Sequence, residues 1–272
     1  MDSRYQMIRA FRRLERRLGY KRRRTSEPYS QRRLSLVVVA VSERLDRVHV
    51  PGMTTNLVPL LEVSGAFLQG CLDAARGVLA MARAREHGGI VAAERAAWEF
   101  WSELDYLLRQ PDPPTAAVTV QVNALMELIK WLRTRGESYP EMLRRNEESL
   151  SRFEHSYPEV VHAVRDRREK GRFHWSGKSR TKVVGPTSVS ADVYKLLSWE
   201  THADVLAIRD VEATIANGDG ALTLYRPDDA LVLALVERSA SSSSECLLRA
   251  WNAFAQFWQQ EELESVPPRK SA

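Results

Sequence analysis

The chain has 272 residues, of which 44% are hydrophobic and 28% charged, a composition typical of a globular protein rather than a disordered one. Its length allows one large domain or two small ones. The two cysteines are too few for a disulfide framework, which favours a reducing compartment. No secretory signal is recognisable, and no apolar run approaches the roughly 20 residues that span a bilayer. The sequence therefore predicts a cytoplasmic protein with no transmembrane segment.

The positive charge of the chain is concentrated at its N-terminus. Residues 1–33 contain 11 arginines and 1 lysine against three acidic residues, a net charge of +9. The whole chain carries +5, which leaves −4 for the remainder. Within this segment the apolar residues Met7, Phe11, Leu14 and Leu18 recur at helical spacing. This spacing predicts an amphipathic helix with arginines around the rest of its surface.

A helix with this charge is expected to contact the phosphates of RNA or DNA. The candidate nucleic-acid-binding residues are Arg9, Arg12, Arg13, Arg16, Arg17, Lys21, Arg22, Arg23 and Arg24. Two other partners stay open, because an Arg-rich amphipathic helix also suits the surface of an anionic membrane, and its apolar stripe suits a partner helix.

Beyond the basic segment, helical periodicity dominates. Residues 30–48 are rich in β-branched side chains, which favour strands, but their apolar positions follow helical spacing, so we expect a helix. Residues 171–188 lack an apolar period and are expected to form a loop, and residues 221–227 a short extended piece. Further helices are expected at about 56–86, 90–109, 115–135, 139–155, 157–170, 189–216 and 228–262.

These patterns predict an all-α protein, a multi-helix bundle of seven to nine helices with a basic N-terminal helical extension. The predicted parts are an Arg-rich amphipathic helix and linker (1–33), a helical domain (34–262) and a flexible tail (263–272). Gly177, Lys178 and Ser179 invite comparison with a phosphate-binding loop. That motif needs a glycine at the position of Arg172 and a preceding strand, so no nucleotide cofactor is expected.

Arg168 and His174 are separated by five residues, which resembles the loose arginine-to-histidine spacing of the metal-independent ribonucleases called HEPN. In such enzymes the histidine would transfer protons and the arginine would hold phosphate charge. The alternative is a basic loop after a helix that Gly171 ends. His155 and His162 lie seven residues apart, which is two helical turns. Histidines that share a metal ion on one helix are usually one turn apart, so no metal site is expected.

Ser198 and His202 are four residues apart on the helix expected over 189–216, so both would face the same way. A serine activated by a histidine is one interpretation. However, nucleophilic serines usually sit on strained turns rather than inside helices. The alternative is that Ser198 bonds back to its own helix while His202 finds a partner on another helix.

Three stretches resemble the uncharacterised helical bacterial family catalogued as domain of unknown function 5677. They are "ERAAWEFWSELDYLL", with Glu99 near its centre, "FHWSGKS", with Trp175, and "YKLLSWETH", with Tyr194, Ser198 and His202. The resemblance covers roughly residues 57–215 and implies an all-helical fold with no established activity. If Glu99, Trp175, Tyr194 and His202 converge, the carboxylate would orient the imidazole, in a structural network by preference or in a catalytic one.

Two functions follow as expectations. The first is a binding or regulatory protein that engages nucleic acid or a partner protein, which includes a second copy of the chain, through its Arg-rich N-terminus. The second is a metal-independent ribonuclease effector. Its candidate catalytic residues are His202, Ser198, Glu99, Arg168 and His174.

Overall fold

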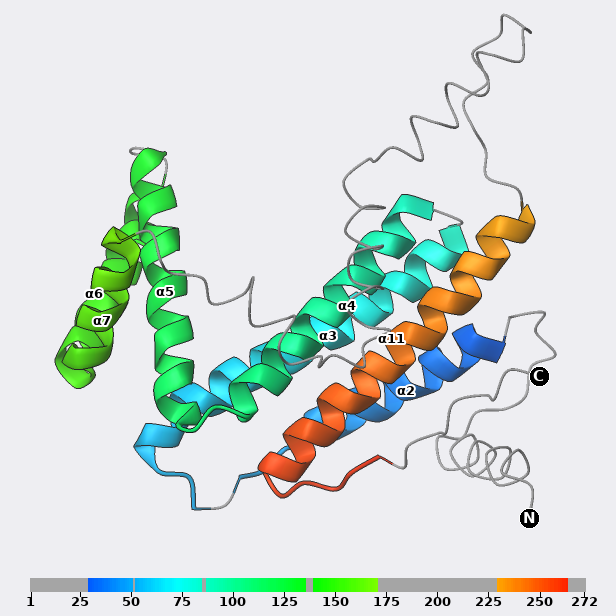
Figure 1. Ribbon diagram of the computed structural model, residues 1–272, viewed down its shortest axis with the longest axis horizontal. Coiled ribbons are helices and arrows are strands. Elements are labelled where there is room, and N and C mark those ends of the chain that lie inside the picture. Colours follow the sequence, from blue (N-terminus) through cyan, green and yellow to red (C-terminus); the bar gives the residue numbers. More distant parts are fainter. Residues whose placement is uncertain (1–28, 51, 85–86, 136–138, 171–228, 264–272) are drawn as a thin grey trace, which may run out of the picture. The chain divides into compact units, whose positions relative to one another are not determined.

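The computed structural model describes residues 29–50, 52–84, 87–135, 139–170 and 229–263, which form seven α-helices and one 3-10 turn (Figure 1). No strand occurs among them, so the prediction of an all-α protein is confirmed. The elements are α2 (Tyr29–Leu45), η1 (Thr55–Leu57), α3 (Val58–Ala84), α4 (His87–Leu108), α5 (Pro113–Thr134), α6 (Pro140–Ser156), α7 (Pro158–Glu169) and α11 (Asp229–Phe257). The helices expected before residue 29 and over 189–216, and the extended piece at 221–227, lie outside the described residues.

The chain divides into two compact units. The first, the four-helix unit, includes α2, residues 68–84 of α3, residues 87–102 of α4, and α11. The second, the three-helix unit, includes α5, α6 and α7 together with residues 58–67 and 103–108.

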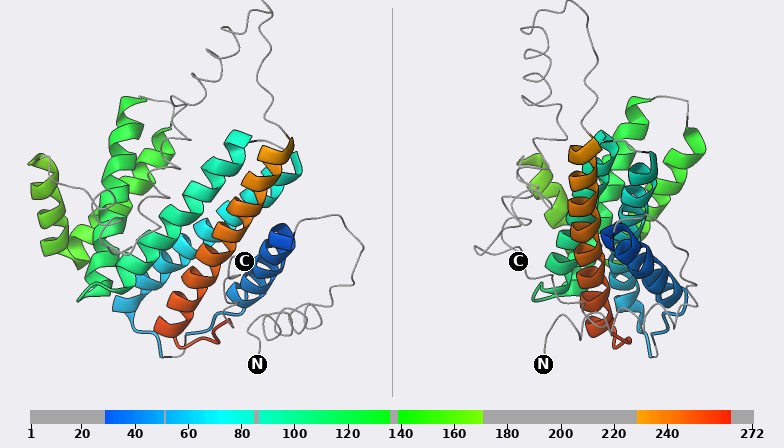
Figure 2. Two further views of the ribbon diagram at one scale, coloured as in Figure 1. Left: turned by 45° about the vertical axis from the view of Figure 1, so that its right-hand side comes forward. Right: turned by 90° about the vertical axis from the view of Figure 1, so that its right-hand side faces the viewer.

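Helix α2 shows that periodicity outweighs β-propensity in this chain. Its β-branched residues lie on both faces, but Leu34, Val37 and Val41 recur on one side and are buried. This side packs against α11, and the two helices lie side by side in all three views (Figures 1 and 2). Helix α2 begins at Tyr29, one residue before the segment expected to be helical, so residues 29–33 of the expected N-terminal part belong to this helix.

Helices α3 and α4 form an antiparallel hairpin with close backbone approach. A Cβ at Gly70 would lie 2.7 Å from the Phe100 ring, and one at Gly77 would lie 3.3 Å from Ala93. Because glycine carries no side chain, the aromatic ring can lie directly against the α3 backbone. Helix α11 adds Leu235 and Val236 to this hairpin core.

Both cysteines lie inside the four-helix unit as free thiols. Cys71 on α3 donates to the Ala97 carbonyl oxygen at 3.6 Å, and Cys246 on α11 is likewise buried. Burial raises the pKa of the Cys71 thiol and the pKa of the Cys246 thiol well above their ordinary values. Neither thiol is therefore a nucleophile in the folded protein.

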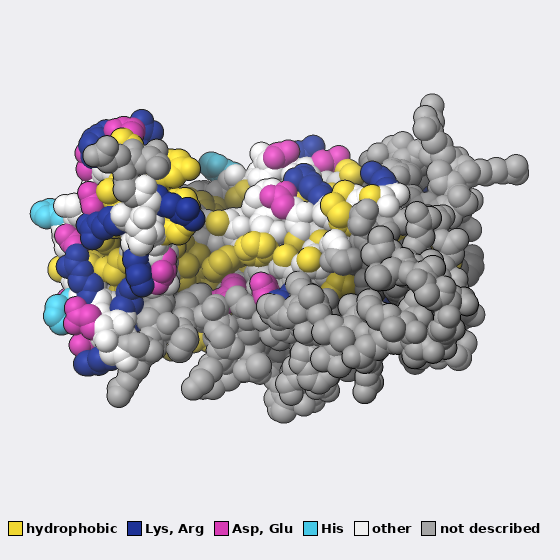
Figure 3. Space-filling model, turned by 90° about the horizontal axis from the view of Figure 1, so that it is seen from above, with side chains coloured by type: hydrophobic (Ala, Val, Ile, Leu, Met, Phe, Trp, Pro, Cys, Tyr) yellow, Lys and Arg dark blue, Asp and Glu magenta, His cyan; other side chains and the backbone are white. Residues whose placement is uncertain are grey.

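The helices of the three-helix unit begin at prolines. Pro140 and Pro158 start α6 and α7, as their Tyr-Pro pairs predict, since proline lacks the N–H that a first turn leaves unpaired. Helix α5 is capped by Asp112, whose carboxylate accepts from the Thr115 backbone N–H at 3.2 Å. The core of the three-helix unit consists of Val118, Val122, Val161 and Val164. Basic and acidic side chains alternate over its surface (Figure 3, left).

One helix in the described part of the chain, Thr55–Ala84, is long and apolar enough to cross a membrane by length and composition. A buried core helix of a soluble protein passes the same test. The absence of a transmembrane segment stays a prediction.

Candidate functional site

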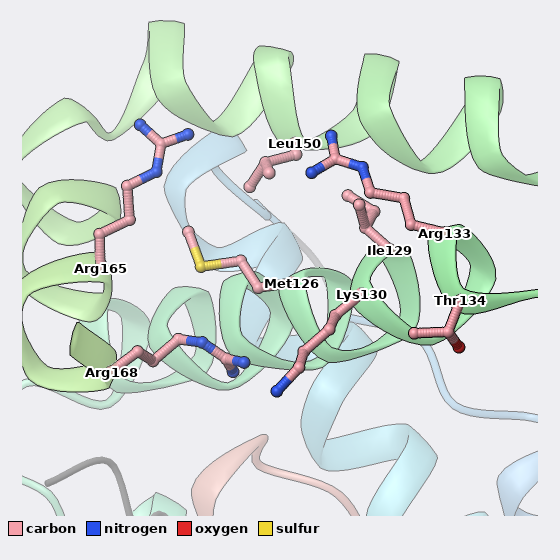
Figure 4. Close-up of a pocket in the computed structure, with 8 residues that line it drawn as sticks. All are labelled: Met126, Ile129, Lys130, Arg133, Thr134, Leu150, Arg165 and Arg168. Carbon is pink, nitrogen blue, oxygen red and sulfur yellow. The ribbon is translucent and has the colours of Figure 1, made fainter. Parts of the chain in front are cut away.

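A pocket of about 490 Å³ opens between α5, α6 and α7 of the three-helix unit. Its volume falls within the range of about 300–1,000 Å³ that is common for small-molecule sites. Helix α5 supplies most of the lining, α6 supplies one leucine and α7 supplies two arginines (Figure 4). The lining residues are Met126, Ile129, Lys130, Arg133, Thr134, Leu150, Arg165 and Arg168.

Helical spacing explains how one surface gathers four cations. Lys130 and Arg133 are three residues apart on α5, and Arg165 and Arg168 are three apart on α7, so each pair lies on one face of its helix. Met126 lies three residues before Ile129 and four before Lys130 on α5, so it is a neighbour of both along the helix surface. The pocket therefore combines an apolar floor with basic walls.

Three of the four cations already hold a polar partner. Arg133 donates to Glu147 at 2.7 and 3.2 Å, and Arg165 pairs with Glu154. Arg168 donates to the Asn123 side chain at 2.7 Å and pairs with Glu127. Each guanidinium has five N–H donors, so these contacts leave further donors on each arginine.

Lys130 differs from the three arginines because no hydrogen bond or ion pair to it occurs within the part of the chain described. Figure 4 shows the Lys130 and Arg168 side chains extending toward each other below Met126. Glu127 already pairs with Arg168, whereas Lys130 has no carboxylate partner among the described residues, so Lys130 would attract an anion that enters the pocket. This arrangement can bind a phosphate or carboxylate group.

Arg168 is the one pocket residue that the sequence picked out. Its side chain is only 20% exposed and is fixed by Asn123 and Glu127 near the end of α7. His174, with which the ribonuclease pattern pairs it, lies outside the described residues. The structure thus places Arg168 in a pocket, and its pairing with the histidine stays a prediction.

Glu99 lies on α4 in the four-helix unit. Its carboxylate accepts from Arg95, one turn earlier, at 3.0 Å. This is an (i, i+4) ion pair on one helix, which is a common way of stabilising a helix surface. Trp175, Tyr194, Ser198 and His202 lie outside the described residues, as do the basic candidates from Arg9 to Arg24. The network proposed around Glu99 therefore stays a prediction.

Sequence analysis missed a buried carboxylate in the four-helix unit. Glu94 on α4 is fully buried, and its Oε2 accepts from the Ser239 hydroxyl at 2.6 Å and from Arg238 at 3.3 Å. Four residues on, Trp98 donates to Ser242 at 2.7 Å. Both contacts advance in the same direction along α4 and α11, so the two helices run parallel, and we call this row of polar contacts the polar seam. The sequence feature that could have identified this carboxylate is the position of Glu94 on the apolar stripe of α4, between Ile90 and Ala97.

The hydrogen bonding of this polar seam is incomplete within the described residues. In that part of the chain, Glu94 Oε1 and the buried Ser243 hydroxyl have no hydrogen-bond partner. Within the same residues, no group of three or more His, Cys, Asp or Glu is placed to hold a metal ion.

Comparisons with models of known protein families, with curated proteins and with solved structures find no match to this chain. The resemblance to the family catalogued as domain of unknown function 5677 therefore stays a prediction.

Proposed function

We propose that the protein is a helical binding protein that engages nucleic acid through its Arg-rich N-terminal segment. The observation that carries the proposal is the charge distribution: +9 over residues 1–33 against −4 over the remainder. Such a segment can neutralise several phosphates at once, and the release of their counterions favours binding.

The described helices support this assignment because most of their cations are already paired with carboxylates. The paired residues include Arg44, Arg76, Arg95, Arg109, Arg133, Arg144, Arg145, Arg165, Arg168, Lys170 and Arg249. On α6, for example, hydrogen bonds from Arg144 and Arg145 lower the pKa of Glu141 to about 2. The cations of the N-terminus, by contrast, lie in a segment with only three acids, so fewer carboxylates compete there with the phosphates of a nucleic acid.

Two arginines of the basic stretch belong to the folded part. Arg33 is buried in α2 and lies 3.7 Å from Glu245 on α11, and Arg32 is in the same helix. The residues before Tyr29 retain nine arginines and Lys21 against three acidic residues, a net charge of +7. A truncation that tests the proposal should therefore remove residues 1–28 and leave α2 intact.

Removal of residues 1–28 is expected to abolish binding to single-stranded RNA and to double-stranded DNA at moderate salt. Fluorescence anisotropy with labelled oligonucleotides measures both affinities, and circular dichroism at 222 nm checks that the helices persist. Vesicles with anionic headgroups form a third arm. Nucleic acid binding that survives the truncation contradicts the proposal, and loss of vesicle binding alone assigns the segment to a membrane surface instead.

The second candidate function is a metal-independent ribonuclease, which the location of Arg168 in a basic pocket favours. An arginine and a lysine on one phosphate could stabilise developing charge while a histidine moves protons. The histidine candidates are His174 and His202, and Ser198 and Glu99 complete the set.

Under this alternative, wild-type protein should cleave single-stranded RNA in the presence of a chelator. Arg168→Ala and His174→Ala should each lower the rate at least about 100-fold, the lower end of what general acid–base catalysis contributes. Arg152→Ala on α6, an exposed arginine outside the pocket, is the matched control and should leave the rate unchanged. Intact RNA after prolonged incubation with wild-type protein at high concentration removes the alternative.

A further inference from the structure

We infer that the pocket between α5, α6 and α7 is a separate ligand site for a small amphiphilic phosphate, a phosphate monoester that carries an aliphatic chain. The inference goes beyond nucleic acid binding by the N-terminus, because it rests on residues of the three-helix unit alone.

The charge of the site specifies the anionic end of the ligand. The pocket is lined by four cations, Lys130, Arg133, Arg165 and Arg168. Each arginine pairs with a glutamate, whereas Lys130 has no acidic partner among the described residues. The side chains of the Arg133–Glu147 pair are 64% and 42% exposed, and those of the Arg165–Glu154 pair are 52% and 38% exposed. Exposed ion pairs of this kind are weak, so these two arginines add positive charge to the pocket wall, on the other side of Met126 from Lys130 and Arg168 (Figure 4).

Arg168 supplies a fixed anchor for the phosphate. Its side chain is mostly buried, and its hydrogen bond to the Asn123 side-chain oxygen and its ion pair with Glu127 hold the guanidinium in place before any ligand arrives. Such preorganisation lowers the entropic cost of binding. Lys130 approaches Arg168 from the neighbouring helix (Figure 4), so a phosphate between them would accept charge-assisted hydrogen bonds from both.

The floor of the pocket specifies the other end of the ligand. Met126, Ile129 and Leu150 are aliphatic, and none of the described lining residues has an aromatic ring on which a nucleobase would stack. None of these lining residues is Asp, Glu, Asn or Gln, and the nearby Asn123 and Glu127 already accept from Arg168. An aliphatic chain fits this floor, since removal of each CH₂ group from water favours binding.

Isothermal titration of the full chain with octyl phosphate, below its micelle concentration, tests the assignment. We expect saturable binding to one site, weaker binding of inorganic phosphate and none of octanol. Lys130→Gln should weaken octyl phosphate at least about tenfold, the loss expected for one charge-assisted hydrogen bond. Arg152→Gln on α6 is the matched control and should have no effect.

Two further variants keep the test independent of folding and of the N-terminus. Leu150→Ala should lower the affinity for octyl phosphate about fivefold and leave the affinity for inorganic phosphate unchanged. A loss of folding would lower both affinities. Replacing Arg12, Arg13 and Arg16 by glutamine should reduce nucleic acid binding and leave octyl phosphate unaffected. If instead this triple variant loses octyl phosphate, or Lys130→Gln binds it like wild type, the inference is overturned.

The same titration distinguishes a soluble ligand from a lipid. Vesicles that contain phosphatidic acid present the same phosphate monoester in a bilayer. Binding to octyl phosphate but not to vesicles indicates a soluble ligand. Binding to both octyl phosphate and vesicles, with both lost in Lys130→Gln, indicates a lipid headgroup. Binding to neither overturns the inference.

Discussion

Arg238→Ala is expected to lower the free energy of unfolding by about 2–3 kcal/mol, because it strips a buried carboxylate of its cation. Glu94 has a side chain only 1% exposed, whereas that of Arg238 is 39% exposed and can be removed without opening a large cavity. The loss comes mainly from the charge left in the interior rather than from lost packing. Urea denaturation followed by circular dichroism at 222 nm measures it.

A double-mutant cycle isolates this electrostatic effect. In a Glu94→Gln background the buried side chain is neutral and still accepts from Ser239, so Arg238→Ala should then cost less than about 1 kcal/mol. Arg249→Ala is the matched control on the same helix. Arg249 pairs with the exposed Glu245 and lies 5.4 Å from the centroid of the Trp101 ring, contacts worth about 1 kcal/mol together. Equal costs for Arg238→Ala in both backgrounds would show that the Glu94 charge is unimportant.

Trp251→Ala should produce the largest loss of stability, about 3–5 kcal/mol, which is the usual cost of deleting a buried tryptophan. Trp251 is 1% exposed on α11, its indole N–H donates to the Glu261 carbonyl oxygen at 3.1 Å, and its ring packs against Phe254. The substitution leaves a cavity and an unpaired carbonyl group together. Thermal and urea denaturation both measure the change.

Trp131→Ala on α5 is the matched control for this deletion. Trp131 is 46% exposed, stacked on Tyr139 at a centroid distance of 6.0 Å, with the Arg135 guanidinium 5.2 Å from the ring centroid. Only surface contacts are lost, so the expected cost is at most about 1 kcal/mol. A loss for Trp131→Ala as large as that for Trp251→Ala would contradict the difference in burial between the two side chains.

The fold was predictable where apolar spacing and helix-start residues agree. Helix α2 is the clearest case, since Leu34, Val37 and Val41 keep a helical period despite their β-branched neighbours, and tertiary packing on α11 satisfies that period. The division into two units was not predictable, because α3 and α4 run through both and no linker composition marks the change.

The candidate site was predictable only in part, because its residues come together through tertiary packing. Arg168 stood out by its spacing to a histidine, but Lys130 lies 38 positions before it on another helix, and no local pattern links the two. Glu94 and Ser239 are likewise 145 residues apart, so the sequence shows a polar residue on an apolar stripe without showing its partner. Apolar periodicity predicts which face of a helix is buried, and it carries no information on which helix covers that face.

The salt dependence of RNA binding measures how many phosphates the N-terminal arginines contact. For the full chain on single-stranded RNA, the slope of log K against log salt concentration should lie between about −3 and −7, as expected for four to ten phosphate contacts. Replacing Arg12, Arg13 and Arg16 by glutamine should make that slope less negative by about 2. A slope near zero, or one that the triple substitution leaves unchanged, would contradict the proposal that the N-terminal arginines bind nucleic acid.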